Sequence, residues 1–278
     1  MRRRREQGAT GALIAVILVL VMVGLFATSV LRRVAASGDE ASETLRRLAA
    51  GADALEQFAA INARLPCPAD PATNDGGEVI TGGNIAKCDF PEGTIPWRTL
   101  GMKFDDALDS WGRKVSYRAY TGTNSVGSLT QPNGISMVEC DTVESVGGAA
   151  TAVSGGLGGL CISNADPLQR STLSASFLAG KGLSLDDFGT PHSDVAYVLI
   201  SHGATGLGGY TVSGIRLDLP SGAERNNTQD TGAFTIRAFS DPDVAADNNA
   251  HFDDLLFYRT LPDLVKRTNL SARDWPET

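Results

Sequence analysis

The chain has 278 residues, 42% of them hydrophobic, and a formal net charge of −8. The first 33 residues carry six arginines and one glutamate, a balance of +5, so the remainder carries −13. This acidic remainder is long enough for one sizeable globular domain, and its charge excludes nucleic acid and anionic lipid as favoured partners.

The first predicted element is a transmembrane helix over 9–33. The charge-free run from Ala9 to Leu31 has 23 residues, and a helix of that length spans a bilayer core of ~30 Å. A cleaved secretory signal is the alternative. The only sequence that resembles a cleavage site, at 34–36, lies beyond Arg32 and Arg33, however. Arginines at 2–5 favour a cytoplasmic amino terminus, which places the residues after Arg33 outside the cytoplasm.

An amphipathic helix is predicted next, over 34–65. Mostly apolar side chains recur there at spacings of three and four, namely Leu45, Leu48, Ala52, Leu55, Ala59 and Asn62. Charged residues fall off this stripe, namely Glu43, Arg46, Arg47, Asp53 and Glu56. Pro66 sets the end of the helix. The apolar stripe requires a protein surface to cover it, and a juxtamembrane stalk is the alternative.

Four cysteines follow, in two pairs whose members are each 21 residues apart: Cys67, Cys88, Cys140 and Cys161. In an oxidising compartment we predict the local pairing Cys67–Cys88 and Cys140–Cys161, although four cysteines allow three connectivities. A metal site built from these cysteines is disfavoured, because the chain has no CxxC motif and only three histidines.

An antiparallel sheet is predicted within the globular region 66–278. Short strand-like segments separated by glycine, proline and asparagine occur at 114–120, 135–139, 195–201, 234–239 and 255–260. The Gly- and Ala-rich stretch 144–160 is predicted to be a loop or a flexible hairpin. The expected fold class is therefore α+β, with a long N-terminal helix, first membrane-spanning and then amphipathic, packed on an antiparallel sheet.

Signals for catalysis are weak, and we predict no enzyme and no catalytic residue. Ser201 and His202 are adjacent, and adjacent residues on a strand point to opposite faces. No G-x-S-x-G motif surrounds Ser201, and "GATGLGG" lacks the Lys-Ser/Thr of a phosphate-binding loop. His192, His202 and His251 are predicted to be turn or surface residues rather than ligands.

These features together resemble the type IV pilin-like proteins, which include the pseudopilins of type II secretion. The resemblance rests on a basic leader (1–8) that ends in Gly8, an apolar helix from Ala9, its amphipathic continuation and a disulfide-bearing sheet domain. Downstream it rests on "ARLPCPADP" (63–71), "GTIPWRTLGM" (93–102), "DALDSWGRKVSYR" (106–118), "VLISHGATGLGGY" (198–210) and "FDDLLFYRT" (252–260). The order of these segments is similar to the sheet region of major pseudopilins.

The resemblance implies that a prepilin peptidase cuts between Gly8 and Ala9 and that the new amino terminus is methylated. The apolar helix would then remain as a single-pass inner-membrane anchor, with the globular domain in the periplasm. It would later contact other pilin-like subunits in a type IV pilus or a type II secretion pseudopilus.

One residue departs from the family pattern. Counted from Ala9, the fifth residue is Leu13, where the family usually has a glutamate that neutralises the amino terminus of the adjacent subunit. The departure indicates a minor subunit at the tip or at the start of a filament. A membrane-anchored periplasmic binding or adhesive domain that does not assemble is the alternative.

The resemblance also implies calcium as a ligand. Five aspartates crowd the segment 239–258, and such carboxylates repel one another unless they are solvated or neutralised by a cation with six to eight oxygen ligands. The family pattern carries over to Asp253 and Asp254, with backbone carbonyls of 201–206 as partners. The chain lacks an aspartate between Gly203 and Gly209, and a solvated acidic loop is the alternative.

Overall fold

The computed structural model describes residues 38–81, 88–122, 128–132, 134–136, 181–228, 232–240 and 249–271. The chain divides into two compact units, Met1–Ser42 and Glu43–Thr278. The elements described below, apart from the start of the first helix, belong to the second unit.

Several predicted features lie outside the described residues: Gly8, Ala9, the apolar run 9–33, Cys140 and Cys161. Within the part of the chain that the structure describes, no helix is both long and apolar enough to cross a membrane. The predicted membrane span stays a prediction.

A helix over 38–62 is the first described element. Four residues of the predicted apolar stripe, Leu48, Ala52, Leu55 and Ala59, are fully buried and belong to one core cluster. Their spacing of three and four places them on one side of the helix. The stripe is shorter than predicted, because Leu45 at its beginning is 44% exposed. The helix ends before Ala63, whose φ of 52° is left-handed.

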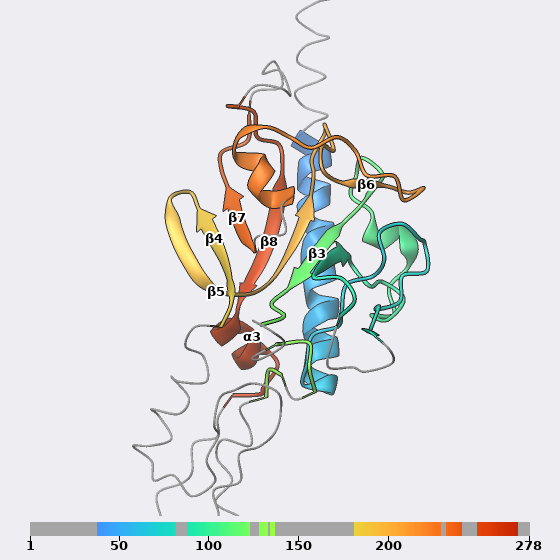
Figure 1. Ribbon diagram of the computed structural model, residues 1–278, viewed down its shortest axis with the longest axis vertical. Helices are drawn as coiled ribbons and strands as arrows, with labels where there is room; N and C mark the ends of the chain where they lie inside the picture. Colours follow the sequence, from blue (N-terminus) through green and yellow to red (C-terminus); the bar gives the residue numbers. More distant parts are fainter. Residues whose placement is uncertain are drawn as a thin grey trace, which may run out of the picture. The chain divides into compact units, whose positions relative to one another are not determined.

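The main sheet, counted over the described residues, has six strands in the order β1-β3-β5-β4-β7, with β8 also paired to β5 (Figure 1). Their bounds are β1 Glu92–Thr94, β3 Ser116–Ala119, β4 Leu183–Asp187, β5 Thr190–Ser201, β7 Ala233–Ile236 and β8 Leu255–Thr260. The strand pairs are antiparallel except for the parallel pair β4–β7. The predicted α+β class is confirmed, and the predicted antiparallel sheet is confirmed except for the parallel pair β4–β7.

The parallel strand β7 enters the sheet directly after the 3-10 helix η4 (Gly222–Thr228). Asn227 of η4 pairs with β7 through its side chain: Thr235 N donates to Asn227 Oδ1 at 2.8 Å, and Asn227 Nδ2 donates to Thr235 O at 3.0 Å. The amide of Asn227 therefore satisfies backbone groups of β7 that a further strand would otherwise pair.

From Val195 onward, the strand β5 is buried on both faces. Tyr197 and Leu199 point into the cluster that holds the 38–62 helix. Val198 and Ile200 point into a second cluster, which contains Phe234 of β7. The near-continuous apolar run that predicted a strand at 195–201 thus reflects burial on two sides, as is usual for a central strand.

The remaining strand predictions had mixed outcomes. The segment 255–260 coincides with β8, which leads into the helix α3 (Leu261–Arg267). The segment 114–120 contains β3 and the end of β2 (Arg113–Lys114), which pairs with β6 (Tyr210–Thr211) in a separate two-stranded sheet. A strand at 135–139 was wrong in its described part, because Ile135 lies in a turn. Ile135 is apolar because it is fully buried in the main core.

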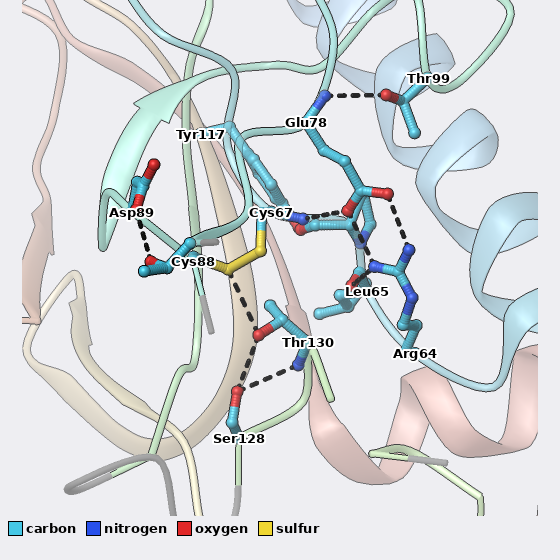
Figure 2. Close-up of a disulfide and its surroundings, with 12 residues drawn as sticks. Arg64, Leu65, Cys67, Glu78, Cys88, Asp89, Thr99, Tyr117, Ser128 and Thr130 are labelled. Atoms are coloured by element: carbon cyan, nitrogen blue, oxygen red, sulfur yellow. Dashed lines mark hydrogen bonds and ion pairs between the residues drawn. A yellow bond between two sulfur atoms is a disulfide. The ribbon is translucent and has the colours of Figure 1, made fainter. Parts of the chain in front are cut away.

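Cys67 and Cys88 form a disulfide, as predicted. Figure 2 shows this disulfide beside an ion pair that fixes the end of the 38–62 helix. Arg64 donates two hydrogen bonds to the carboxylate of Glu78, at 2.8 and 2.7 Å, and Cys67 N donates to the same carboxylate at 3.0 Å. Tyr117 of β3 donates to Pro66 O at 3.1 Å. The disulfide and the ion pair therefore hold the same stretch of chain against the sheet.

Glu78 is expected to make the free energy of unfolding depend on pH in the acidic range. Burial alone would raise the pKa of Glu78, but the Arg64 guanidinium and Cys67 N–H bring that pKa below its ordinary value of 4.5. Because the folded pKa is lowered, the stabilisation is present above about pH 4.5 and is lost as the pH falls through the folded value. We expect Glu78→Gln to lose about 1 to 2 kcal/mol at pH 7 and to show a flatter pH dependence below 4.5. Urea unfolding between pH 3 and pH 7 measures both effects.

The control for this prediction is Asp75→Asn. The Asp75 carboxylate pairs with Arg98 at 2.5 Å, but its side chain is 56% exposed, and exposed ion pairs contribute little to stability. An equal loss in both variants, or an unchanged acid slope in Glu78→Gln, would contradict the assignment.

Candidate functional site

Ser116 of β3, His202 and Asp254 form a buried series of hydrogen bonds. Ser116 Oγ lies 3.1 Å from His202 Nε2, and His202 Nδ1 lies 3.3 Å from Asp254 Oδ1. Asn227 Nδ2 donates to the other Asp254 oxygen at 2.8 Å. The neighbouring Ser201 turns elsewhere and donates to Asp109 Oδ2 at 2.7 Å. The prediction that Ser201 and His202 diverge agrees with this geometry.

The order serine, histidine, aspartate is that of a hydrolase triad, but the surroundings do not suit catalysis. A nucleophile requires an open side from which a substrate can approach. Ser116 is 5% exposed, and its strand pairs with β1 on one edge and with β5 on the other. We therefore assign these three side chains the structural role of joining β3, the loop after β5 and the segment before β8.

A second group of buried polar residues lies next to this series. Glu224 of η4, His251 and Asp253 each offer one ligand atom, and these atoms all lie within 4.8 Å of one another. All three residues are buried. We call them the Glu224–His251–Asp253 cluster.

Two close contacts between backbone segments, each at a glycine, hold this cluster in place. Gly222 has a φ of 62°, and a Cβ there would lie 2.3 Å from Asn249 O, so η4 presses closely on the segment before His251. Gly203 has a φ of 56°, and a Cβ there would lie 2.1 Å from Asp253 O. Glycine is the residue that tolerates both the left-handed conformation and the close contact. The two glycines therefore bring η4, the loop after β5 and the segment 249–254 together.

The carboxylates of the cluster accept several hydrogen bonds. Thr205 donates to Asp253 through its backbone N at 2.7 Å and through its hydroxyl at 3.1 Å. Glu224 Oε1 accepts from the backbone N of Asp253 and, at 3.3 Å, from that of Asp254. These donors fix the orientation of both carboxylates.

The surroundings of Glu224 disfavour the ionised form of its carboxyl group. Burial, followed by the charges of Asp254 and Asp253, raises the pKa of Glu224 to about 8. A cation placed between the carboxylates would oppose this shift, because it favours their ionised forms.

No family model, no curated protein and no solved structure matches this chain. Assignment of a function therefore rests on the residues and their geometry.

Of the calcium ligands that the pilin resemblance implies, Asp253 lies against the loop 203–205, whereas Asp254 does not. Asp253 lies in the cluster, but Asp254 turns away to His202 and Asn227. The Gly203 carbonyl accepts a hydrogen bond from the Arg113 guanidinium, as does that of Ala204 at 2.8 Å. A fixed cationic side chain thus already pairs with these two oxygens. This set does not fit an ion that requires six to eight oxygen ligands.

Prediction of the site from sequence missed Glu224 and misplaced two histidines. His202 and His251 were predicted as turn or surface residues, and both are buried. One signal in the sequence could have found the pairing of His251 with Asp253. Residues two apart in an extended segment point to the same face, and their neighbours point to the other. This alternation explains why His251 and Asp253 meet while Asp254 joins a different network.

Proposed function

We propose that this chain is a structural subunit of a type IV pilus or a type II secretion pseudopilus, in a minor, tip or initiating position. Before assembly, the run 9–33 anchors it in the inner membrane as a single span, and the domain after it lies in the periplasm. Other pilin-like subunits contact it through the N-terminal helix. Its role is architectural rather than catalytic.

The observation that carries this proposal is the position of the 38–62 helix. Four residues separate its start from the predicted membrane segment, which ends at 33. Its apolar stripe packs into the core beneath a mainly antiparallel sheet. One helical stretch can therefore serve both the globular domain and a membrane or filament core. The disulfide Cys67–Cys88 supports an oxidising compartment such as the periplasm.

The proposed position in the filament rests on Leu13. Burial of a charged amino terminus among apolar helices is costly unless a carboxylate pairs with it. A subunit with leucine at this place fits best where no neighbour presents such an amino terminus. The competing function is an anchored periplasmic binding or adhesive domain that never assembles.

We expect the mature protein to begin at Ala9 with a methylated amine. The reason is the arginine-rich leader, which ends in Gly8 immediately before the apolar run. Intact-mass spectrometry of the membrane fraction from the native host measures this end directly. Gly8→Val is expected to leave the chain unprocessed, since the resemblance implies cleavage directly after this glycine.

The matched control is Gly38→Val. A Cβ at Gly38 meets no atom within 4 Å, so this change is expected to leave processing intact. A mature chain that starts at Met1 would favour the anchored domain. A start beyond Ala36 would indicate a cleaved secretory signal, and either result would contradict the filament proposal.

A further inference from the structure

We propose that the Glu224–His251–Asp253 cluster binds one divalent transition-metal ion of the zinc class, through one nitrogen of His251 and one oxygen of each carboxylate. This proposal rests only on the geometry of the cluster. It is therefore independent of the filament proposal.

The first step is the state of His251. Its side chain is 7% exposed, and among the described residues neither ring nitrogen has a hydrogen-bond partner. A buried polar group without a partner is costly, so such a group indicates a missing ligand. The imidazole thus supplies an unused donor atom at the side of two carboxylates.

The second step is a distance. His251 Nε2 lies 3.6 Å from Asp253 Oδ2, which is too long for a hydrogen bond. Two ligand atoms that each lie 2.0–2.2 Å from a tetrahedral zinc ion are themselves separated by about 3.4 Å. The observed separation therefore fits two atoms that share a cation better than two atoms that share a proton.

The third step is the support around the carboxylates. Metal-ligating carboxylates are usually held by hydrogen bonds from a surrounding layer of donors. Thr205 supplies two such donors to Asp253, and the backbone of 253–254 supplies them to Glu224. A divalent cation would also balance the two negative charges that this buried site holds when both carboxylates are ionised.

The mixed donor set decides the class of metal. One imidazole and two carboxylates suit zinc and its first-row neighbours, which accept nitrogen and oxygen together. Calcium requires six to eight oxygens, and magnesium retains several waters in an octahedral arrangement. Three protein ligands leave a fourth position that water can fill.

The test uses the full chain, purified without a polyhistidine tag, treated with chelator and then titrated with Zn²⁺, Ca²⁺ or Mg²⁺. We expect one bound zinc per chain by elemental analysis. We also expect the melting temperature to rise by about 5 °C at a hundredfold excess of Zn²⁺ over its dissociation constant. Equal concentrations of Ca²⁺ or Mg²⁺ are expected to leave the melting temperature within about 1 °C.

His251→Ala is expected to abolish the zinc-dependent shift and to weaken zinc binding at least tenfold. His192→Ala is the matched control, since His192 contacts Tyr258 outside the cluster, and it should bind zinc like the unaltered chain. If His251→Ala does not fold, the visible absorption of the unaltered chain with Co²⁺ decides, because a four-coordinate site gives intense bands. A spectrum of six-coordinate hydrated Co²⁺, zinc binding retained in His251→Ala, or a calcium shift as large as the zinc shift would each overturn the proposal.

Discussion

Glu56→Ala is expected to lower the free energy of unfolding by about 2 kcal/mol, because it removes a buried carboxylate that accepts hydrogen bonds from two arginines. Glu56 lies on the 38–62 helix and is 8% exposed. Its carboxylate accepts hydrogen bonds from Arg259 of β8 at 2.8 Å and from Arg267 of α3 at 2.5 Å. Tyr197 donates to the same carboxylate at 3.3 Å. Chemical denaturation followed by circular dichroism measures the loss.

Asp53→Ala provides the control on the same helix. Asp53 lies 4.0 Å from Arg267, but its side chain is 67% exposed, and its removal is expected to cost less than about 1 kcal/mol. Glu56→Gln retains an acceptor for the arginines and should fall between the two. The assignment fails if Glu56→Ala and Asp53→Ala destabilise the protein equally.

The second large effect is expected when Cys67 and Cys88 are both replaced by serine. The disulfide closes a loop with a sequence separation of 21, and the chain-entropy model assigns such a loop about 3 kcal/mol of stabilisation. The free energy of unfolding should fall by that amount at pH 7, without loss of the far-ultraviolet circular dichroism spectrum. Denaturant titration under non-reducing conditions provides the measurement.

The comparison variant replaces Cys140 and Cys161 by serine, which leaves the Cys67–Cys88 bond intact. Peptide mapping of the unaltered chain without reductant is expected to link Cys67 to Cys88 and Cys140 to Cys161. A crossed linkage, or a double serine variant at 67 and 88 that is as stable as the unaltered chain, would contradict this prediction.

Much of the fold could be predicted because local patterns match the packing. The apolar positions from Leu48 to Ala59 follow the helical period and are buried as a group. The segment 195–201 is apolar throughout because both faces of β5 are covered. The apolar and aromatic segment 255–260 coincides with β8.

Other features depend on contacts that no local pattern contains. Glu56 lies off the apolar stripe, and a charged residue in that place is usually solvated, yet two arginines from the end of the chain allow its burial. Glu224 belongs to a polar stretch between β6 and β7 and reaches Asp253 only through the close approach at Gly222. The parallel direction of β7 likewise depends on the place where η4 ends, because β7 follows η4 in the chain.

The link between Glu56 and its arginines also constrains when folding can finish. Arg259 and Arg267 follow Glu56 by 203 and 211 residues. A ribosome makes the helix long before it makes β8 and α3, and such distant contacts form slowly because a long loop must close first. The contacts that bury the Glu56 carboxylate can therefore form only after β8 and α3 have been made.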